Sequence, residues 1–181
     1  LNSRQKRTER LLVSRSLMIA EVTESYERLH AAVSTAVMHM GIDRLRFALP
    51  DGFEVTEVSG VHVSRWAVST ADDRRILEVS LREETTDTVV VNIVAMRRSG
   101  DLSNWSFPKL QPLDVVSRVA LTGLLVEDRL KAENIRHSAM APVNVSVLNQ
   151  GLPASVAMAA EGGISLRPVV AYYAAQGDFD L

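Results

Sequence analysis

The side chains of this sequence that could bind metal are few and scattered. Its four histidines, His30, His39, His62 and His137, have no i, i+2 or i, i+4 partner that would place two imidazoles on one face of a strand or helix. A zinc or iron site needs several converging ligands, and the chain contains no cysteine. We therefore expect no metal site and no cofactor.

Acidic pairs and glycine motifs are equally weak candidates for catalysis. The pairs Asp72–Asp73, Glu83–Glu84 and Asp178 with Asp180 could serve as general acids and bases or bind calcium, but each falls where a turn or tail is expected. No G-x-S-x-G nucleophile elbow is present. Gly162–Gly163 lacks the Lys-Ser or Lys-Thr of a phosphate-binding loop and indicates a hairpin turn. The sequence predicts no catalytic residue and no enzyme.

The two tryptophans are the remaining candidates for recognition. A tryptophan can stack on a sugar or anchor a partner protein, or it can fill a core. Trp66 shares a strand face with Val68, so we expect it to be buried in the core. Trp105 lies beside Phe107 in an irregular segment, and it is the one residue that we single out as a ligand contact.

Composition limits the possible partners. The net charge is −2 and the pI is about 6.1, which gives no electrostatic footprint for nucleic acid. The basic residues of the first fifteen positions indicate a solvated start rather than a lipid or nucleic-acid patch. No apolar run approaches the roughly 18–20 residues that span a bilayer, so we expect no membrane insertion within this segment. The chain begins with Leu1, which favours an excerpt from a larger protein.

Residues 42–98 have the pattern of short strands at hairpin spacing. Leu45, Phe47 and Leu49 alternate with polar residues, as do Leu77, Val79 and Leu81, and Asp72–Asp73 marks a turn. A change of phase between Val63 and Trp66 indicates a β-bulge. We expect at least four strands here, with Leu45, Phe47, Leu49, Val79 and Leu81 buried, as in a β-sandwich.

The second half is less regular. An irregular connector covers 99–112 and contains Trp105. Residues 115–126 are apolar, 130–135 are a candidate hairpin partner for them, and Val143, Val145 and Val147 alternate as in a strand. A last hairpin is expected from 156–160 and 164–173. We divide the chain into a β-rich portion at 1–98, the connector, and a second β-rich portion at 113–181 that can belong to the same domain.

Residues 15–40 allow two interpretations. Met18, Val22, Tyr26, Leu29, Val33, Val37 and Met40 follow one another at spacings of three or four, which is the stripe of an amphipathic helix ending at Gly41. That interpretation would make the fold α+β.

The stretch from Leu29 to Val68 resembles an uncharacterised module of large bacterial envelope proteins of planctomycete type. The resemblance lies in Leu49-Pro50-Asp51-Gly52-Phe53, in Val58-Ser59-Gly60 and in Val63-Ser64-Arg65-Trp66, and more loosely in the Trp105–Pro112 connector with Arg118 and Gly123. It implies a β-sandwich-like unit of a long ectodomain, with no catalytic residue. It also implies strands rather than a helix at 15–40, and we adopt that interpretation.

These observations predict a mainly β, antiparallel sandwich-like fold. The expected function is a non-enzymatic structural or interaction module of a larger extracytoplasmic or cell-envelope protein, contacting other domains of its parent chain or another protein. The alternative is a carbohydrate-binding module that uses Trp105. A third hypothesis is an enzyme whose site is completed by parts of the protein outside this segment.

Overall fold

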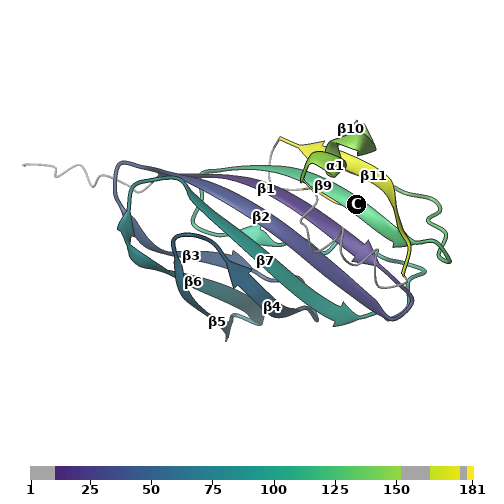
Figure 1. Ribbon diagram of the computed structural model, residues 1–181, viewed down its shortest axis with the longest axis horizontal. Helices are drawn as coiled ribbons and strands as arrows, with labels where there is room; N and C mark the ends of the chain where they lie inside the picture. Colours follow the sequence, from purple (N-terminus) through teal and green to yellow (C-terminus); the bar gives the residue numbers. More distant parts are fainter. Residues whose placement is uncertain (1–10, 152–163, 176–178) are drawn as a thin grey trace, which may run out of the picture.

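The computed structural model describes residues 11–151, 164–175 and 179–181 and shows two β-sheets facing each other (Figure 1). The large sheet has seven strands in the order β10-β11-β9-β1-β2-β7-β4, and the small sheet has four in the order β5-β6-β3-β8. Every neighbouring pair is antiparallel except β1 and β9, which are parallel. The predicted mainly β, sandwich-like fold is confirmed.

The elements follow the chain in a simple order. They are β1 (Leu11–Val22), β2 (Tyr26–Met38), β3 (Ile42–Ala48), β4 (Glu54–Ser59), β5 (Val63–Ala71), β6 (Arg74–Thr85), β7 (Val89–Arg98), β8 (Gln111–Pro112), β9 (Ser117–Glu127), β10 (Ala141–Val143), the 3₁₀ helix η1 (Val145–Val147), α1 (Leu148–Gly151) and β11 (Leu166–Ala174). Because β9 pairs with β1, the portions before and after the connector at 99–112 contribute strands to one sheet.

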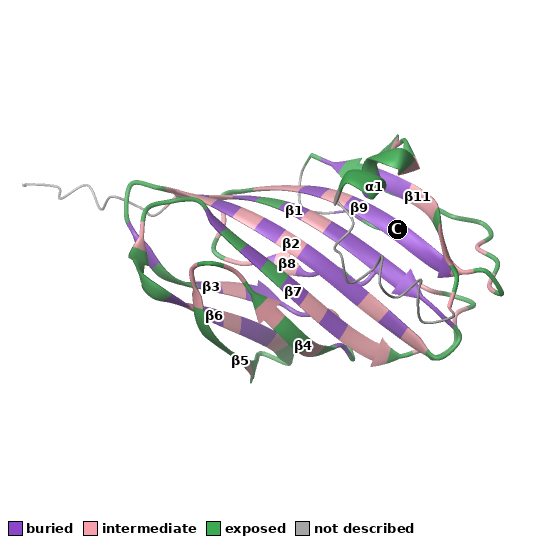
Figure 2. Cartoon of the chain, in the orientation of Figure 1, coloured by how far each residue is buried: buried purple, intermediate pink, exposed green. Residues whose placement is uncertain are grey.

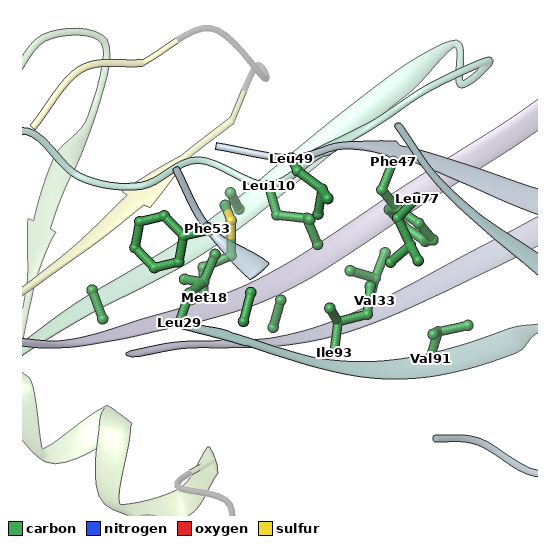
Figure 3. Close-up of a cluster of buried hydrophobic side chains, with 14 of the residues drawn as sticks. Met18, Leu29, Val33, Phe47, Leu49, Phe53, Leu77, Val91, Ile93 and Leu110 are labelled. Carbon is green, nitrogen blue, oxygen red and sulfur yellow. The ribbon is translucent and has the colours of Figure 1, made fainter. Parts of the chain in front are cut away.

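The core lies between the two sheets. Alternate residues of β1, β2 and β7 point inward from the large sheet, and β3 and β6 oppose them from the small sheet. Figure 3 shows Val33 facing Phe47 and Leu77, with Met18 and Leu29 at the Phe53 end of the same cluster. The stretch 42–98 contains five strands, β3 to β7. The five residues predicted to be buried there have exposed fractions of 8% or less: Leu45, Phe47, Leu49, Val79 and Leu81.

Residues 15–40 form most of a β-hairpin, so the helical alternative is wrong. Apolar residues four positions apart share a face in a strand as well as in a helix, because four is a multiple of the strand period of two. Leu29, Val33 and Val37 accordingly all point into the core. A turn at Thr23 separates the two strands, and it is stabilised by Thr23 Oγ1, which accepts hydrogen bonds from the backbone N–H groups of Ser25 and Tyr26.

The second half differs from its prediction in two places. Residues 130–135 do not return as a strand; they form a loop, and the Arg167 guanidinium donates to the carbonyl oxygen of Leu130 at 2.5 Å. The alternation at 143–147 breaks after Val143, because the Asn144 side chain accepts from the N–H of Ser146 and caps a 3₁₀ turn. The predicted strand at 164–173 is present as β11, whereas 156–160 and Gly162–Gly163 lie outside the described residues.

Trp66 is not a core residue, contrary to the prediction. It does share the inward face of β5 with Val68, since the bulge falls between Val63 and Arg65 as expected. However, β5 is the edge strand of the small sheet, and Trp66 remains 37% exposed. Figure 2 shows β5 largely in the colours of exposed and intermediate residues. Alternation therefore predicted correctly that Trp66 and Val68 share a face of β5. It could not predict whether the large sheet covers that face.

Candidate functional site

A buried ion pair organises one end of the inner face of the large sheet. Glu27 on β2 lies directly opposite Arg97 on β7. The Arg97 guanidinium donates from Nε to Oε2 at 2.6 Å and from Nη2 to Oε1 at 3.0 Å, a bidentate geometry. The Glu27 side chain is 3% exposed, and Arg97 also lies over the Phe53 ring, 4.8 Å from its centroid. The Arg97 guanidinium is therefore held by the Glu27 carboxylate and by the face of the Phe53 ring.

Trp105 is attached to this pair. Its indole Nε1–H donates to Oε1 of Glu27 at 2.5 Å, and its ring meets Phe107 edge to face, with 6.1 Å between the ring centroids. The polar edge of the indole is thus satisfied within the protein, and the ring is held in one orientation. The residue singled out from the sequence is anchored by a buried carboxylate that the sequence analysis did not identify.

Beside Trp105 lies a cavity of about 830 Å³, which we call the Trp105 cavity. Its floor is the inward-facing, apolar surface of β1 and β9, formed by Val22, Leu124 and Val126. Two loops close its sides, the connector at 102–105 and the loop at 130–136. Polar side chains stand on these loops: Ser103, Asn104, Lys131, Glu133, Asn134 and Arg136.

The lining of this cavity combines apolar and polar side chains. Lys131 and Glu133 pair with each other at 2.5 Å on the rim, with side chains 82% and 59% exposed. Both oxygens of Glu27 are already engaged by Arg97 and Trp105, so this carboxylate is not free to act as a base. The cavity therefore has an apolar floor, a fixed aromatic ring and a polar rim.

A second buried pair lies on the outer face of the same β-hairpin. Oε2 of Glu21 and Nε2 of His30 are 2.5 Å apart, with side chains 0% and 3% exposed, and Arg28 approaches the same oxygen at 3.5 Å. Among the described residues, Oε1 of Glu21 and Nδ1 of His30 have no hydrogen-bond partner. None of the cavities described includes either residue. We interpret the pair as a structural contact between β1 and β2.

This pair also acts on its neighbour Tyr26. Burial raises the pKa of the Tyr26 phenol above its ordinary value, and the nearby Glu21 carboxylate raises it further. The Arg28 guanidinium, 5.0 Å from the centroid of the Tyr26 ring, opposes this effect and lowers the phenol pKa. The hydroxyl is therefore held in its neutral form.

The acidic pairs and histidines found in the sequence do not converge. Asp72 and Asp73 form the turn between β5 and β6, with φ of 50° and 58°. Glu83–Glu84 lie within β6 rather than in a turn, and Asp178 lies outside the described residues. Across 11–151, 164–175 and 179–181, no three His, Asp or Glu side chains are placed to hold a metal ion. Within the same described part, no helix is long and apolar enough to cross a membrane.

The sequence did contain a signal for both buried pairs. Once a hairpin turn is placed at 23–25, Glu21 lies opposite Arg28 and diagonal to His30 on one face, while Glu27 falls among the inward-facing residues of β2. Charged residues at such positions need buried partners. The partners Arg97 and Trp105 are 70 and 78 positions away, so they could not be assigned without the strand order.

Comparison with known proteins gives a likeness of fold alone. No protein-family model matches the sequence, and no curated protein is similar to it. The M1 zinc metallopeptidase of Deinococcus radiodurans matches with a TM-score of 0.50 and 9% identity, over 96% of this chain and 42% of that chain. Leukotriene A4 hydrolase of Saccharomyces cerevisiae gives 0.46 and 9%, over 96% and 32%.

A non-cellulosomal cohesin of the archaeon Archaeoglobus fulgidus gives a TM-score of 0.35 and 12% identity, over 61% of this chain and 91% of that chain. The chain spans less than half the length of the metallopeptidases that it matches, and it shares with them the arrangement of its strands.

Proposed function

We propose that this chain is a non-enzymatic interaction module of a larger extracytoplasmic protein, and that the Trp105 cavity contacts a polypeptide segment. That segment belongs to another domain of the parent chain or to a partner protein. The observation that carries the proposal is a cavity of about 830 Å³ between the two loops, next to an aromatic ring that is held rigidly in place.

The apolar side chains of the two loops favour a polypeptide over a sugar. Leu102, Leu130 and Ile135 line the cavity and remain partly exposed, so aliphatic or aromatic side chains would cover them with a gain of about 25 cal/mol for each Å² removed from water. Trp105 contributes a rigid ring with little entropy to lose, as aromatic anchors do in protein interfaces. The charged and amide side chains of the rim would then surround an apolar contact, which is the usual anatomy of an interface.

The carbohydrate alternative has one observation in its favour. Ser103, Asn104 and Asn134 stand near Trp105, and hydroxyl and amide groups beside an aromatic ring suit a sugar. Against it, the indole N–H is already bound to Glu27 and cannot reach a ligand. Sugar hydroxyls over Leu102, Leu130 and Ile135 would also lose hydrogen bonds to water without replacement.

A ligand titration followed by NMR separates these functions. The ¹⁵N-labelled chain is titrated with N-acetyl amides of leucine, phenylalanine and serine, and separately with methyl glycosides of glucose and N-acetylglucosamine. The chain has two indole N–H signals, and a Trp66→Phe variant assigns that of Trp105 by difference. We expect the leucine and phenylalanine amides to shift the Trp105 signal and the backbone signals of Leu124 and Val126.

Each outcome has a distinct meaning. Shifts with the apolar amides but not with the serine amide support the polypeptide proposal. Shifts produced by the glycosides alone would replace it with the carbohydrate alternative. If none of the probes moves the signals of the cavity, or if an Ala132→Trp variant that fills the cavity responds as the natural chain does, the cavity is not the binding site.

A further inference from the structure

The edge strand β5 presents an unused backbone edge. It pairs with β6 on one side only, as the terminal strand of the small sheet. Apart from the N–H of Val63, which bonds to Gly60 within the preceding turn, no backbone bond beyond that ladder is found for this strand among the described residues. Free N–H and C=O groups along an edge form a template for another strand.

The sequence of β5 does little to prevent such pairing. Proteins usually protect exposed edges with lysines, prolines, bulges or short strands. The run from Trp66 to Ala71 contains no charge and no proline, and the bulge and Arg65 both lie before it. Trp66, 37% exposed, extends from the uncovered part of this strand. These features point to an edge that accepts a partner strand.

We infer that β5 pairs antiparallel with β5 of a second copy of this chain, centred on Ala67, so that the two small sheets join into one. A twofold axis through Ala67 sets Trp66 of each copy opposite Val68 of the other, both on the inward face. The same register sets Arg65 opposite Ser69. Such pairing closes on itself and stops at two copies, as isologous contacts do.

Self-complementarity favours a second copy over an unrelated strand. An aromatic side chain opposite a β-branched one stabilises a sheet, and this pair occurs twice in the proposed register. Arg65 is the only charged residue of β5, and it meets a hydroxyl rather than the arginine of the other copy. Beyond the strand ends, the acidic turn at Asp72 of one copy approaches His62 of the other, so like charges do not meet there.

Sedimentation equilibrium of charge variants tests the register as well as the association. Ala67 is exposed and lies opposite itself in the pair, so Ala67→Lys and Ala67→Glu each set two like charges against each other. We expect the natural chain to dimerise reversibly as its concentration rises. We expect either variant alone to raise the dissociation constant about tenfold or more, and an equimolar mixture of the two to form a heterodimer.

Controls make each result decisive. Ser59→Lys places the same charge on the exposed edge strand β4 and should leave dimerisation unchanged. Ser69→Lys, which sets a lysine opposite Arg65, should weaken the dimer and serves as a second variant if Ala67→Lys fails to fold. A natural chain that stays monomeric at all concentrations overturns the inference. So does a mixture of the Ala67 variants that does not associate, or a mass that keeps growing beyond two copies.

Discussion

Replacing Glu27 with alanine should destabilise the protein strongly, because this carboxylate holds together three parts of the chain. It binds Arg97 through two hydrogen bonds and Trp105 through a third. Removing one member of a buried ion pair costs about 3–5 kcal/mol. The Arg97 side chain is 31% exposed and keeps its bond to the carbonyl oxygen of Asp51, so water would recover part of its solvation. The Trp105 indole N–H would lose its partner, at a cost of about 1–3 kcal/mol.

We therefore expect Glu27→Ala to lower the free energy of unfolding by about 3 kcal/mol. Urea unfolding followed by circular dichroism measures the loss. The matched control is Glu54→Ala, because Glu54 accepts the same bidentate bond from Arg75, at 2.9 and 2.8 Å, but is 73% exposed. That variant should lose no more than about 1 kcal/mol. Equal losses in the two variants would refute the conclusion that burial makes the Glu27 pair structural.

Four further substitutions test the packing. Gly60→Ala should cost about 1–3 kcal/mol, because the new Cβ would lie 2.5 Å from the carbonyl oxygen of Val90. Trp66→Ala should cost about 1 kcal/mol or less, since the side chain is only partly covered. Glu21→Leu and His30→Leu should each cost about 3 kcal/mol or more, while the double variant costs less than their sum, because it removes both members of the buried Glu21–His30 contact. Urea unfolding measures all five variants.

The controls for these substitutions come from the same chain. Gly100→Ala, where nothing lies within 4 Å of the new Cβ, should leave the unfolding midpoint unchanged. Phe47→Ala should cost about 3–5 kcal/mol, as expected for a buried aromatic residue. A loss at Trp66 as large as that at Phe47 would show that the indole is covered after all. Additive losses at Glu21 and His30 would show that these side chains do not depend on each other.

The strands of the first half could be predicted from the sequence because their alternation is strict. Leu77, Val79 and Leu81 alternate with polar residues, and this period of two is typical of a strand rather than a helix. The Asp72–Asp73 turn then joins β5 and β6 into the observed hairpin. At 15–40 the periodicity favoured a helix, which is wrong, because a spacing of four places residues on one face of a strand as well as of a helix. The apolar Ile19 on the outer face of β1 further obscures the strand alternation. The strand interpretation came from the resemblance, whose implication of an envelope module remains a prediction.

The site was predictable only in part, since it depends on contacts between distant segments. Trp105 was selected from its residue type and its place in the connector, and it does line a cavity. Its role as a ligand contact remains a prediction. The cavity floor could not be foreseen, because the parallel pairing of β1 with β9 joins residues about a hundred positions apart. Whether the large sheet covers Trp66 likewise depends on the order of the strands, which alternation does not encode.

The most direct test of the Trp105 cavity as a contact site is photo-crosslinking in the full-length parent protein. A benzoylphenylalanine replaces Asn134 on the cavity rim, with a control at Ser59 on the exposed edge of β4. After irradiation, mass spectrometry identifies what is attached at each position. We expect a single polypeptide segment, from another domain of the same protein or from a partner, attached at position 134 and absent at position 59. A glycan at position 134, or the same products at both positions, would contradict the proposed function.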